Sequence, residues 1–216
     1  MAVSQTLFHF TTEEEVRRTA QFRRDMFEGS GNLDEDTLAV DEDFDASSNC
    51  VVVGIVERDE IMAVMRIHVL GGKVRTSPAH HVFPDVLGPE LDRGVRIVDS
   101  SGFCVRSALS RERIDAAYRL LAVSIHIAGR LSPSKMIATA RGKHGLFYRH
   151  VFGGRLACEA RSYPGRRHPL SLYIQDTGDL VARLDNRGER RFQLDGADRA
   201  IVDGALKTVM DRRGEG

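Results

Sequence analysis

Two apolar stretches rich in β-branched residues, residues 50–56 and 60–70, follow one another with only the charged run Glu57-Arg58-Asp59-Glu60 at their junction. β-Branched side chains favour strands, and a short polar run between two such stretches favours a tight turn. We therefore predict a β-hairpin here, ended by Gly71-Gly72. This hairpin begins a sheet, and the elements predicted around it decide the fold class.

The longest periodic stretch is residues 111–131, whose apolar residues recur at three- and four-residue steps. This pattern indicates an amphipathic helix that packs on the sheet. Its inward residues are Ile114, Ala117, Tyr118, Leu121, Ile125 and Ala128. A second helix is predicted from Thr11 to about residue 27, because Thr11 or Thr12 can cap it and three glutamates suit the positive end of its dipole.

The remaining stretches complete a mixed sheet with helices on its faces, which is not a doubly wound pattern. One further strand is interrupted or bulged around Ser100-Ser101-Gly102. We predict strands at residues 95–98 with 103–105, 136–140, 155–160 and 170–175, a helix at 145–152, an irregular segment at 29–49, and a loop with one helical turn at 76–93.

Balanced charge limits the kinds of partner. The 216 residues include 31 Lys and Arg and 31 Asp and Glu, so we predict no nucleic-acid partner. The length fits one domain, residues 1–216, in which residues 177–216 form a peripheral helical tail. No stretch approaches the ~20 apolar residues of a membrane span, so we predict a cytoplasmic protein. Cys50, Cys104 and Cys158 lack paired spacing and are expected to be buried thiols.

Several kinds of active site are excluded by their missing motifs. The chain has no glycine-rich phosphate loop, no nucleophile elbow and no H-E-x-x-H helix. His80 and His81 stand near Asp85, but a proline-rich loop does not fix the geometry that a metal needs. We predict no metal site.

Four short motifs, in this order and with these separations, carry a resemblance to a known family. They are Phe22-Arg23-Arg24-Asp25-Met26-Phe27, Asp41-Glu42-Asp43-Phe44-Asp45, Val64-Met65-Arg66-Ile67 and Asp99-Ser100-Ser101-Gly102-Phe103. Together they resemble the acyl-homoserine-lactone (autoinducer) synthases and the related N-acyl amino acid synthases. The resemblance covers roughly residues 15–173.

This resemblance implies both a fold and a reaction. The fold is α/β and GNAT-like, the acyl-CoA N-acyltransferase fold, whose mixed central sheet has splayed strands and is flanked by helices. The reaction moves a fatty acyl group from a thioester to the amino group of an amino acid or a similar amine. The donor is an acyl-phosphopantetheine thioester, on acyl carrier protein or coenzyme A, and no cofactor is bound permanently. The expected partners are therefore an acyl carrier protein and a small-molecule amine.

The resemblance also assigns residues to the acceptor side of the site. Charge-assisted hydrogen bonds from two arginines can hold an acidic loop over an acceptor pocket. The residues that match are Arg23, Phe27, Glu42, Asp43, Asp45 and Arg66. Without the resemblance, the plainer interpretation is a solvated acidic loop with ordinary exposed arginines.

The reacting centre is expected on the bulged strand. Asp99, followed by Ser100 and Ser101, stands where the family usually has glutamate and can accept the acceptor's proton directly or through water. Backbone N–H groups of Phe103-Cys104-Val105 can stabilise the oxyanion formed from the thioester carbonyl.

The donor side is expected to be basic. The turn at residues 107–113 lacks the glycines with which acetyltransferases hold coenzyme A pyrophosphate. It keeps basic residues, since Arg106 precedes it and Arg111 and Arg113 lie within it. This favours acyl carrier protein over coenzyme A as the donor. The apolar run 145–148, with Leu156 and Ala157, either lines an acyl tunnel or is plain core.

Two departures from the autoinducer synthases leave alternatives open. Gly102 stands where those enzymes place an arginine, and the chain has no tryptophan where they commonly have one, near residues 32–34. Both departures favour an N-acyl amino acid synthase. The alternatives are an acyl-homoserine-lactone synthase that uses S-adenosylmethionine, and a non-catalytic module that binds an acyl ligand or carrier protein.

Overall fold

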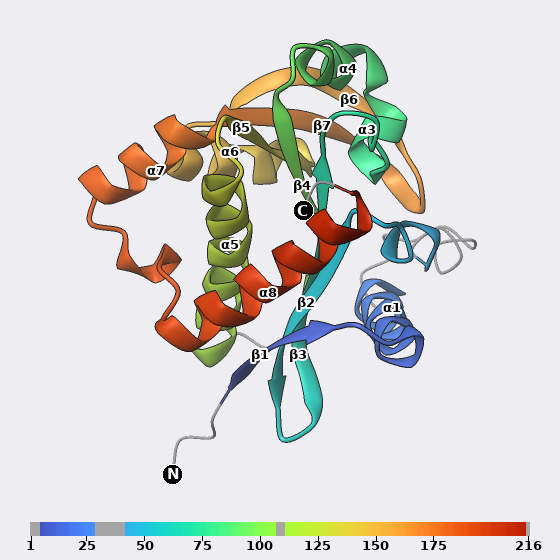
Figure 1. Cartoon of the computed structure of the whole chain (residues 1–216), viewed down its shortest axis with the longest axis vertical. Coiled ribbons are helices and arrows are strands. Elements are labelled where there is room, and N and C mark those ends of the chain that lie inside the picture. The colour runs from blue at the N-terminus through green and yellow to red at the C-terminus, as the bar shows by residue number, and fades with distance from the viewer. Residues whose placement is uncertain (1–4, 29–41, 107–110, 215–216) are drawn as a thin grey trace.

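The structure is a computed structural model that describes residues 5–28, 42–106 and 111–214, without the side chains of residues 111–113 and 143. A seven-stranded sheet with the order β1-β2-β3-β4-β5-β7-β6 forms its centre (Figure 1). Every neighbouring pair is antiparallel except β4 and β5. The strands are β1 (Thr6–Phe10), β2 (Cys50–Glu57), β3 (Glu60–Leu70), β4 (Arg96–Val105), β5 (Ser134–Ala140), β6 (Arg155–Tyr163) and β7 (Arg166–Asp176).

Helices cover both faces of this sheet (Figure 1). Side chains of α5, α6, α7 and α8 share one core with the sheet, and those of α1, α3 and α4 pack against the opposite face. The helices are α1 (Glu13–Glu28), α3 (Pro78–Val82), α4 (Pro84–Asp92), α5 (Arg111–Arg130), α6 (Gly142–Phe152), α7 (Thr177–Asn186) and α8 (Gly196–Arg212). A 3₁₀ turn, Arg190–Phe192, lies between the last two, and residues 42–45 form a helical turn before β2.

The predicted hairpin is confirmed as β2 and β3. Glu57 pairs with Glu60 across a two-residue turn, in which Arg58 and Asp59 have φ values of 49° and 65°. Two consecutive positive φ values are typical of a type I′ turn, whose backbone twist matches the twist of the paired strands. The predicted long helix is confirmed as α5, and the first helix as α1.

Alternation along β3 places apolar and polar side chains on different faces of the sheet. Met65, Ile67 and Val69 belong to the core that α5 covers. Arg66 and His68, which alternate with them, therefore point to the face that α1 and α3 cover. Both polar side chains are buried, so their hydrogen bonds have to come from other parts of the protein.

The sheet divides between β4 and β5. These strands pair from Arg96 with Ser134 to Asp99 with Ile137, and the pairing stops there. On its other side, β4 continues along β3, with a shift in register between Arg66 opposite Ser101 and Val64 opposite Cys104. The predicted bulge is therefore present. The strands that diverge beyond it confirm the predicted mixed sheet with splayed strands.

Residues 76–93 differ from the predicted loop with one helical turn, because they form two successive helices, α3 and α4. Ser77 caps α3 by accepting a hydrogen bond from the His80 N–H at 3.1 Å. Pro78 and Pro84 each open a helix, where the missing N–H of proline costs nothing. The prolines that indicated a loop are thus helix starts.

Two further differences lie at the ends of the chain. The edge strand β1 was not predicted, since five residues give little periodicity. The chain after Asp176 was expected as a peripheral helical tail, but α7 and α8 contribute to the main core. Their buried apolar residues include Leu180, Leu184, Val202, Ala205 and Val209. The frequent charges between these positions concealed their helical spacing.

An ion pair joins α8 to α5 and provides a test of this arrangement. Arg119 donates to both carboxylate oxygens of Asp198, with Nη2 to Oδ1 at 2.6 Å, and the Asp198 side chain is 4% exposed. Arg119→Met leaves that carboxylate unpaired, so we expect the free energy of unfolding in urea to fall by about 2 kcal/mol. Arg17→Met, which breaks an exposed pair with Glu13, should cause no measurable change.

Candidate active site

A cavity of about 800 Å³ occupies the space where β4 and β5 diverge. Its walls come from both faces of the sheet, since α5 and α6 line one side and α1 with the β6–β7 hairpin lines the other. The described residues that line it include Met26, Phe27, Arg66, Ser100, Ser101, Gly102, Phe103, Cys104, Val105, Tyr118, Leu121, Thr139, Phe147, Tyr148, Tyr163, Arg166 and Leu170. A substrate in this cavity can therefore be contacted from both faces of the sheet.

Asp45 lies between two arginines beside this cavity. The Arg23 guanidinium, on α1, donates to Asp45 Oδ2, and Arg66 Nη1, on β3, lies 3.4 Å from Asp45 Oδ1. The side chains of Arg23 and Asp45 are both fully buried. Arg66 Nε also donates to Ser101 Oγ at 3.0 Å, so this cluster of charged groups links α1, the 42–45 turn, β3 and β4.

Gly102 sits against the same cluster. Its φ of +60° belongs to the left-handed region that favours glycine. A Cβ at this position would lie 3.1 Å from Arg23 Cδ and 3.5 Å from Arg66 Cγ. Autoinducer synthases have an arginine at this position. Here the space beside Gly102 is filled by the side chains of Arg23 and Arg66, which come from two other elements.

His68 fixes the 42–45 turn from the same face of β3. Its Nε2 donates to the Phe44 carbonyl oxygen at 3.0 Å, which requires the neutral ring to carry its proton on Nε2. The Phe44 ring lies edge-on to His68 and beneath the Arg66 guanidinium. Burial, with the nearby positive charge of Arg66, lowers the pKa of His68 to about 3.

Asp99 lies next to the cavity without lining it. Its carboxylate is fully buried and Oδ2 accepts a hydrogen bond from the Ala79 N–H, at the start of α3, at 3.1 Å. Burial raises the pKa of Asp99, and hydrogen bonds from Ser77 and Ala79 oppose that shift. Because Asp99 does not line the cavity, its position does not favour direct proton transfer from an acceptor amine.

Ser100 and Ser101 both line the cavity but have different surroundings. The Ser101 hydroxyl accepts from Arg66, whereas the Ser100 hydroxyl donates to Ser124 on α5 at 2.8 Å. The two hydroxyls face opposite sides of β4. Phe103, Cys104 and Val105 follow on the wall, beyond the last residue of β4 that pairs with β5.

Phe27 is covered by an arginine that the sequence analysis did not select. The Arg166 guanidinium, at the start of β7, lies 4.0 Å from the centre of the Phe27 ring, and both residues line the cavity. Tyr163, at the end of β6, is a second lining residue that was missed. No local pattern identifies either, because they reach the site only when the β6–β7 hairpin folds back over the sheet.

Several predicted site residues lie elsewhere. Asp43 is exposed and Glu42 partly exposed, and neither lines the cavity. Arg106 is directed toward the β2–β3 hairpin, where it donates to the Ile61 carbonyl oxygen at 3.2 Å and pairs with Glu60 at 3.4 Å. The turn at 107–110 and the side chains of Arg111 and Arg113, predicted to bind the carrier, lie outside the described residues.

The apolar residues predicted for an acyl tunnel divide into two groups. Phe147 and Tyr148 line the cavity, and burial raises the pKa of the Tyr148 phenol. Leu146 and Leu156 are exposed and do not line it. Leu146 faces solvent while Phe147 and Tyr148 face the cavity, because the run lies on a helix with one exposed side.

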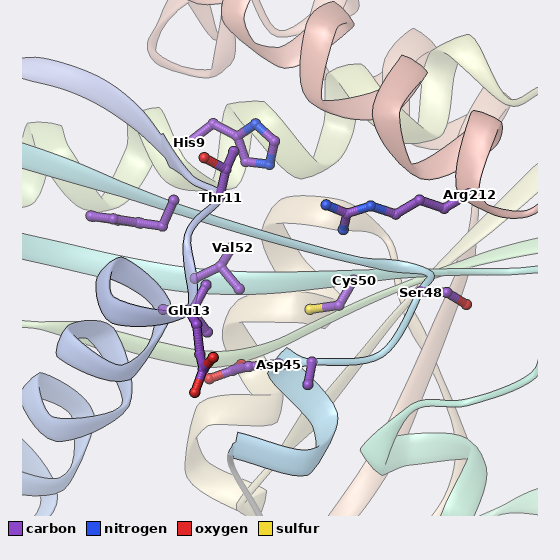
Figure 2. A pocket seen from close by; sticks show the side chains of 11 residues that line it. His9, Thr11, Glu13, Asp45, Ser48, Cys50, Val52 and Arg212 are labelled. Carbon is purple, nitrogen blue, oxygen red and sulfur yellow. The ribbon is translucent and has the colours of Figure 1, made fainter.

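A second hollow, of about 440 Å³, lies at the edge of the sheet beside α1. The 42–45 turn forms part of its wall. Figure 2 shows His9 of β1 and Arg212 of α8 on one side of it, with Glu13 and Asp45 on the other. Its lining residues do not include β4 or β5, so it does not reach the point where those strands diverge.

Metal ligands and membrane spans can be assessed over the described part of the chain. No group of three or more His, Cys, Asp or Glu side chains there could hold a metal ion. His80 and His81 lie on the short helix α3. None of the described helices is both long and apolar enough to cross a membrane.

Similarity to solved structures defines the class of fold. An acyl-CoA N-acyltransferase from Pseudomonas aeruginosa superimposes with a TM-score of 0.52 at 14% identity, over 81% of this chain and 99% of that one. The CoA-dependent acyl-homoserine lactone synthase BjaI, solved with MTA, gives 0.50 at 13% identity, over 88% and 90%. The fold is therefore that of the GNAT acyltransferases, as the sequence predicted.

A family model gives the more specific assignment. The model of the N-acyl amino acid synthase FeeM matches residues 18–176, so the chain belongs to this family. The structure of FeeM, an N-acyl amino acid synthase from uncultured soil microbes, superimposes with a TM-score of 0.67 at 12% identity, over 84% of this chain and 96% of that one. Comparison with curated protein sequences gives no match. The protein is thus an N-acyltransferase of the FeeM kind, as predicted, and uses an acyl thioester.

Substitution of Gly102 tests whether the charged cluster requires a glycine there. Gly102→Ala and Gly94→Ala both force a side chain into positive φ, a cost of about 1–2 kcal/mol, but nothing lies within 4 Å of a Cβ at Gly94. We expect only Gly102→Ala to displace Arg23 and to lower acyl transfer. Amide formation measured for both variants separates the two effects, and equal activities would contradict this role of the cluster.

The buried neutral His68 predicts a pH dependence of stability. Its pKa is lower in the folded than in the unfolded protein, so the unfolded chain binds the extra proton as the pH falls below about 6.5. Between pH 7 and pH 5 this should remove about 2 kcal/mol of unfolding free energy. Urea unfolding at both pH values should show this loss in the wild type and a smaller loss in His68→Gln. His9 and His80, whose pKa values are also lowered, remain in both proteins.

Proposed function

We propose that this synthase takes its acyl group from the phosphopantetheine arm of an acyl carrier protein and transfers it to the α-amino group of an amino acid. The observation that carries the proposal is the cavity between β4 and β5, which is mainly apolar on the α5 and α6 side and has Arg66 and Arg166 on the α1 side. The two sides suit the two substrates.

The thioester is proposed to lie along β4 beyond the point where its pairing with β5 ends. There the backbone N–H groups of residues 103–105 are proposed to donate to its carbonyl oxygen. Such donors stabilise the negative charge that develops on this oxygen when the amine attacks. The apolar lining from Tyr118, Leu121, Phe147 and Leu170 accepts the methylene groups.

The acceptor is proposed to enter from the side of α1. Arg66 and Arg166 both line that part of the cavity, and a guanidinium group binds a carboxylate through paired hydrogen bonds. Phe27, held beneath Arg166, provides an apolar surface for the acceptor side chain. Asp45 keeps Arg66 in place, and Glu42 and Asp43 are proposed to attract the ammonium group from the exposed side of the turn.

Transfer requires that the acceptor lose a proton before or during attack. Asp99 is proposed to take that proton, and its distance from the cavity wall requires an intermediate group. Ser101, which accepts from Arg66, orients the neighbouring guanidinium. Ser100 is proposed to lie beside the reacting thioester as part of the cavity wall.

The donor is proposed to be a carrier protein because of the turn that follows β4. Residues 107–113 contain no glycine, which favours a single phosphopantetheine phosphate over the pyrophosphate of coenzyme A. Arg106, Arg111 and Arg113 are proposed to meet the acidic carrier surface. Lactone formation from S-adenosylmethionine is less favoured, because Arg23 and Arg66 fill the space beside Gly102.

Mass spectrometry of purified protein tests the proposed function. The protein is incubated with pooled amino acids and one acyl chain, presented on acyl carrier protein or on coenzyme A, with S-adenosylmethionine in parallel tubes. We expect an N-acyl amino acid, formed at least ~10-fold faster from the carrier. A lactone only with S-adenosylmethionine would replace the proposal by the autoinducer reaction, and intact thioester throughout would overturn it.

Separate substitutions test the assignment of the two sides. Arg66→Ala should raise the acceptor KM by about 10-fold or more while thioester binding stays within about 2-fold, because Arg66 lies on the side of the cavity that is proposed to bind the acceptor. Arg111→Ala combined with Arg113→Ala should do the reverse. Steady-state kinetics with varied acceptor and varied carrier thioester give both values, and equal losses in both would contradict the assignment.

A further inference from the structure

Several buried polar atoms of the described chain lack a hydrogen-bond partner, and three of them belong to one region of the sheet. They are His68 Nδ1, Asp99 Oδ1 and Tyr163 Oη. His68 and Asp99 are directly opposite each other on β3 and β4, so their side chains share a face. Burial raises the pKa of the Tyr163 phenol and the charge of Asp99 adds to that shift, while the Thr139 hydroxyl opposes it.

Tyr163 differs from the other two residues because it also lines the substrate cavity. Only 6% of the residue is exposed, and its ring packs in the same apolar cluster as Ala79, whose N–H binds Asp99. Asp99 and His68 are fully buried and do not line the cavity. Of the three residues, Tyr163 is therefore the one that belongs both to the cavity wall and to the apolar cluster beside Asp99.

Buried hydroxyl and carboxyl groups almost always have hydrogen-bond partners. A buried water typically makes about three hydrogen bonds, which is the number of partners that these three groups offer. Asp99 Oδ2 accepts from the Ala79 N–H, and His68 Nε2 donates to the Phe44 carbonyl oxygen. The other polar atom of each side chain, Asp99 Oδ1 and His68 Nδ1, is therefore available to a water.

The charged and titratable groups that face this region come from every neighbouring element. They are Cys50 of β2, Arg66 and His68 of β3, Asp99 of β4, Arg23 of α1 and Tyr163 with Arg166 of the β6–β7 hairpin. Arg66 favours the ionised form of Asp99, and burial favours the neutral form. His68 remains neutral at ordinary pH, so Asp99 is the acidic group able to take up a proton here.

We propose that Tyr163 is the group through which Asp99 acts: its hydroxyl, joined to Asp99 by a water that His68 also holds, carries the acceptor's proton out of the cavity. This inference rests on the proposed function and supplies the intermediate group that it requires. The Tyr163 oxygen accepts a proton from the acceptor ammonium while its own proton passes through the water to Asp99 Oδ1.

The atoms balance without any further reactant. The neutral amine forms a C–N bond to the thioester carbonyl carbon, the C–S bond breaks, and the thiolate takes up one proton from the amine nitrogen. The relay leaves one proton on Asp99 for each ammonium that is deprotonated, and that proton returns to solvent after the amide leaves. Tyr163 ends each cycle with its hydroxyl proton restored.

The test compares Tyr163→Phe with Tyr173→Phe, a matched variant of a buried tyrosine on β7 that does not line the cavity. We measure kcat/KM for the amino acid from pH 6 to pH 10, and thioester binding as a control for folding. Tyr163→Phe should lose at least ~10-fold near pH 7 and recover toward high pH, where the amine loses its proton unaided. Tyr173→Phe should keep the wild-type profile.

A double variant completes the test. Because Tyr163 and Asp99 act in one path, Tyr163→Phe with Asp99→Asn should be no slower than the slower single variant. A wild-type pH profile in Tyr163→Phe, or losses that multiply in the double variant, would overturn the relay while amide formation by the wild type upholds the proposed function. Absence of amide from the wild-type protein would overturn both.

Discussion

The buried carboxylate of Asp45 between Arg23 and Arg66 is the interaction on which the site depends. Arg23 comes from α1, Asp45 from the turn before β2, and Arg66 from β3, so three separate parts of the chain meet at one carboxylate. Charges removed from water cost free energy unless each is paired and hydrogen-bonded. Thr19 and Ser101 supply further hydrogen bonds to the two guanidinium groups. The turn and the helix are therefore held on the sheet by charge.

This cluster acts together with the divided sheet. The end of pairing between β4 and β5 opens a cavity that passes between the two faces, and the cluster forms part of one wall. Gly102, at positive φ, lets β4 approach the arginines closely at the point where the strand bulges. The β6–β7 hairpin then closes the same side through Arg166 and Tyr163. A thioester along β4 and an amine beside Arg66 can meet there.

Much of the fold could be predicted because its signals are local. The hairpin, α5 and the bulged strand each follow from periodicity or turn chemistry within about twenty residues. The proline-rich segment was predicted wrongly, since proline starts helices as well as interrupting them. The burial of α7 and α8 was missed because charged residues stand between their buried apolar positions, as Asp198 of α8 does, which pairs with Arg119 of α5.

The site was predictable only in part, for a different reason. The motifs brought Arg23, Asp45, Arg66 and Ser101 together, and the structure places these four in contact. Arg166 and Tyr163 were missed because their approach depends on how one hairpin curves over the sheet, which leaves no mark in its own sequence. Asp99 was predicted to accept the proton directly or through water, and it lies next to the cavity without lining it, because its position depends on the direction of its side chain.

The measurement that tests this account most directly is the urea unfolding of Asp45→Asn beside the wild type. The substitution keeps the shape of the side chain and removes the charge between two buried guanidinium groups. The account predicts that the free energy of unfolding falls by about 3 kcal/mol or more, because breaking a buried pair leaves its partners uncompensated. Unchanged stability would contradict the claim that this carboxylate holds α1 and the turn against the sheet.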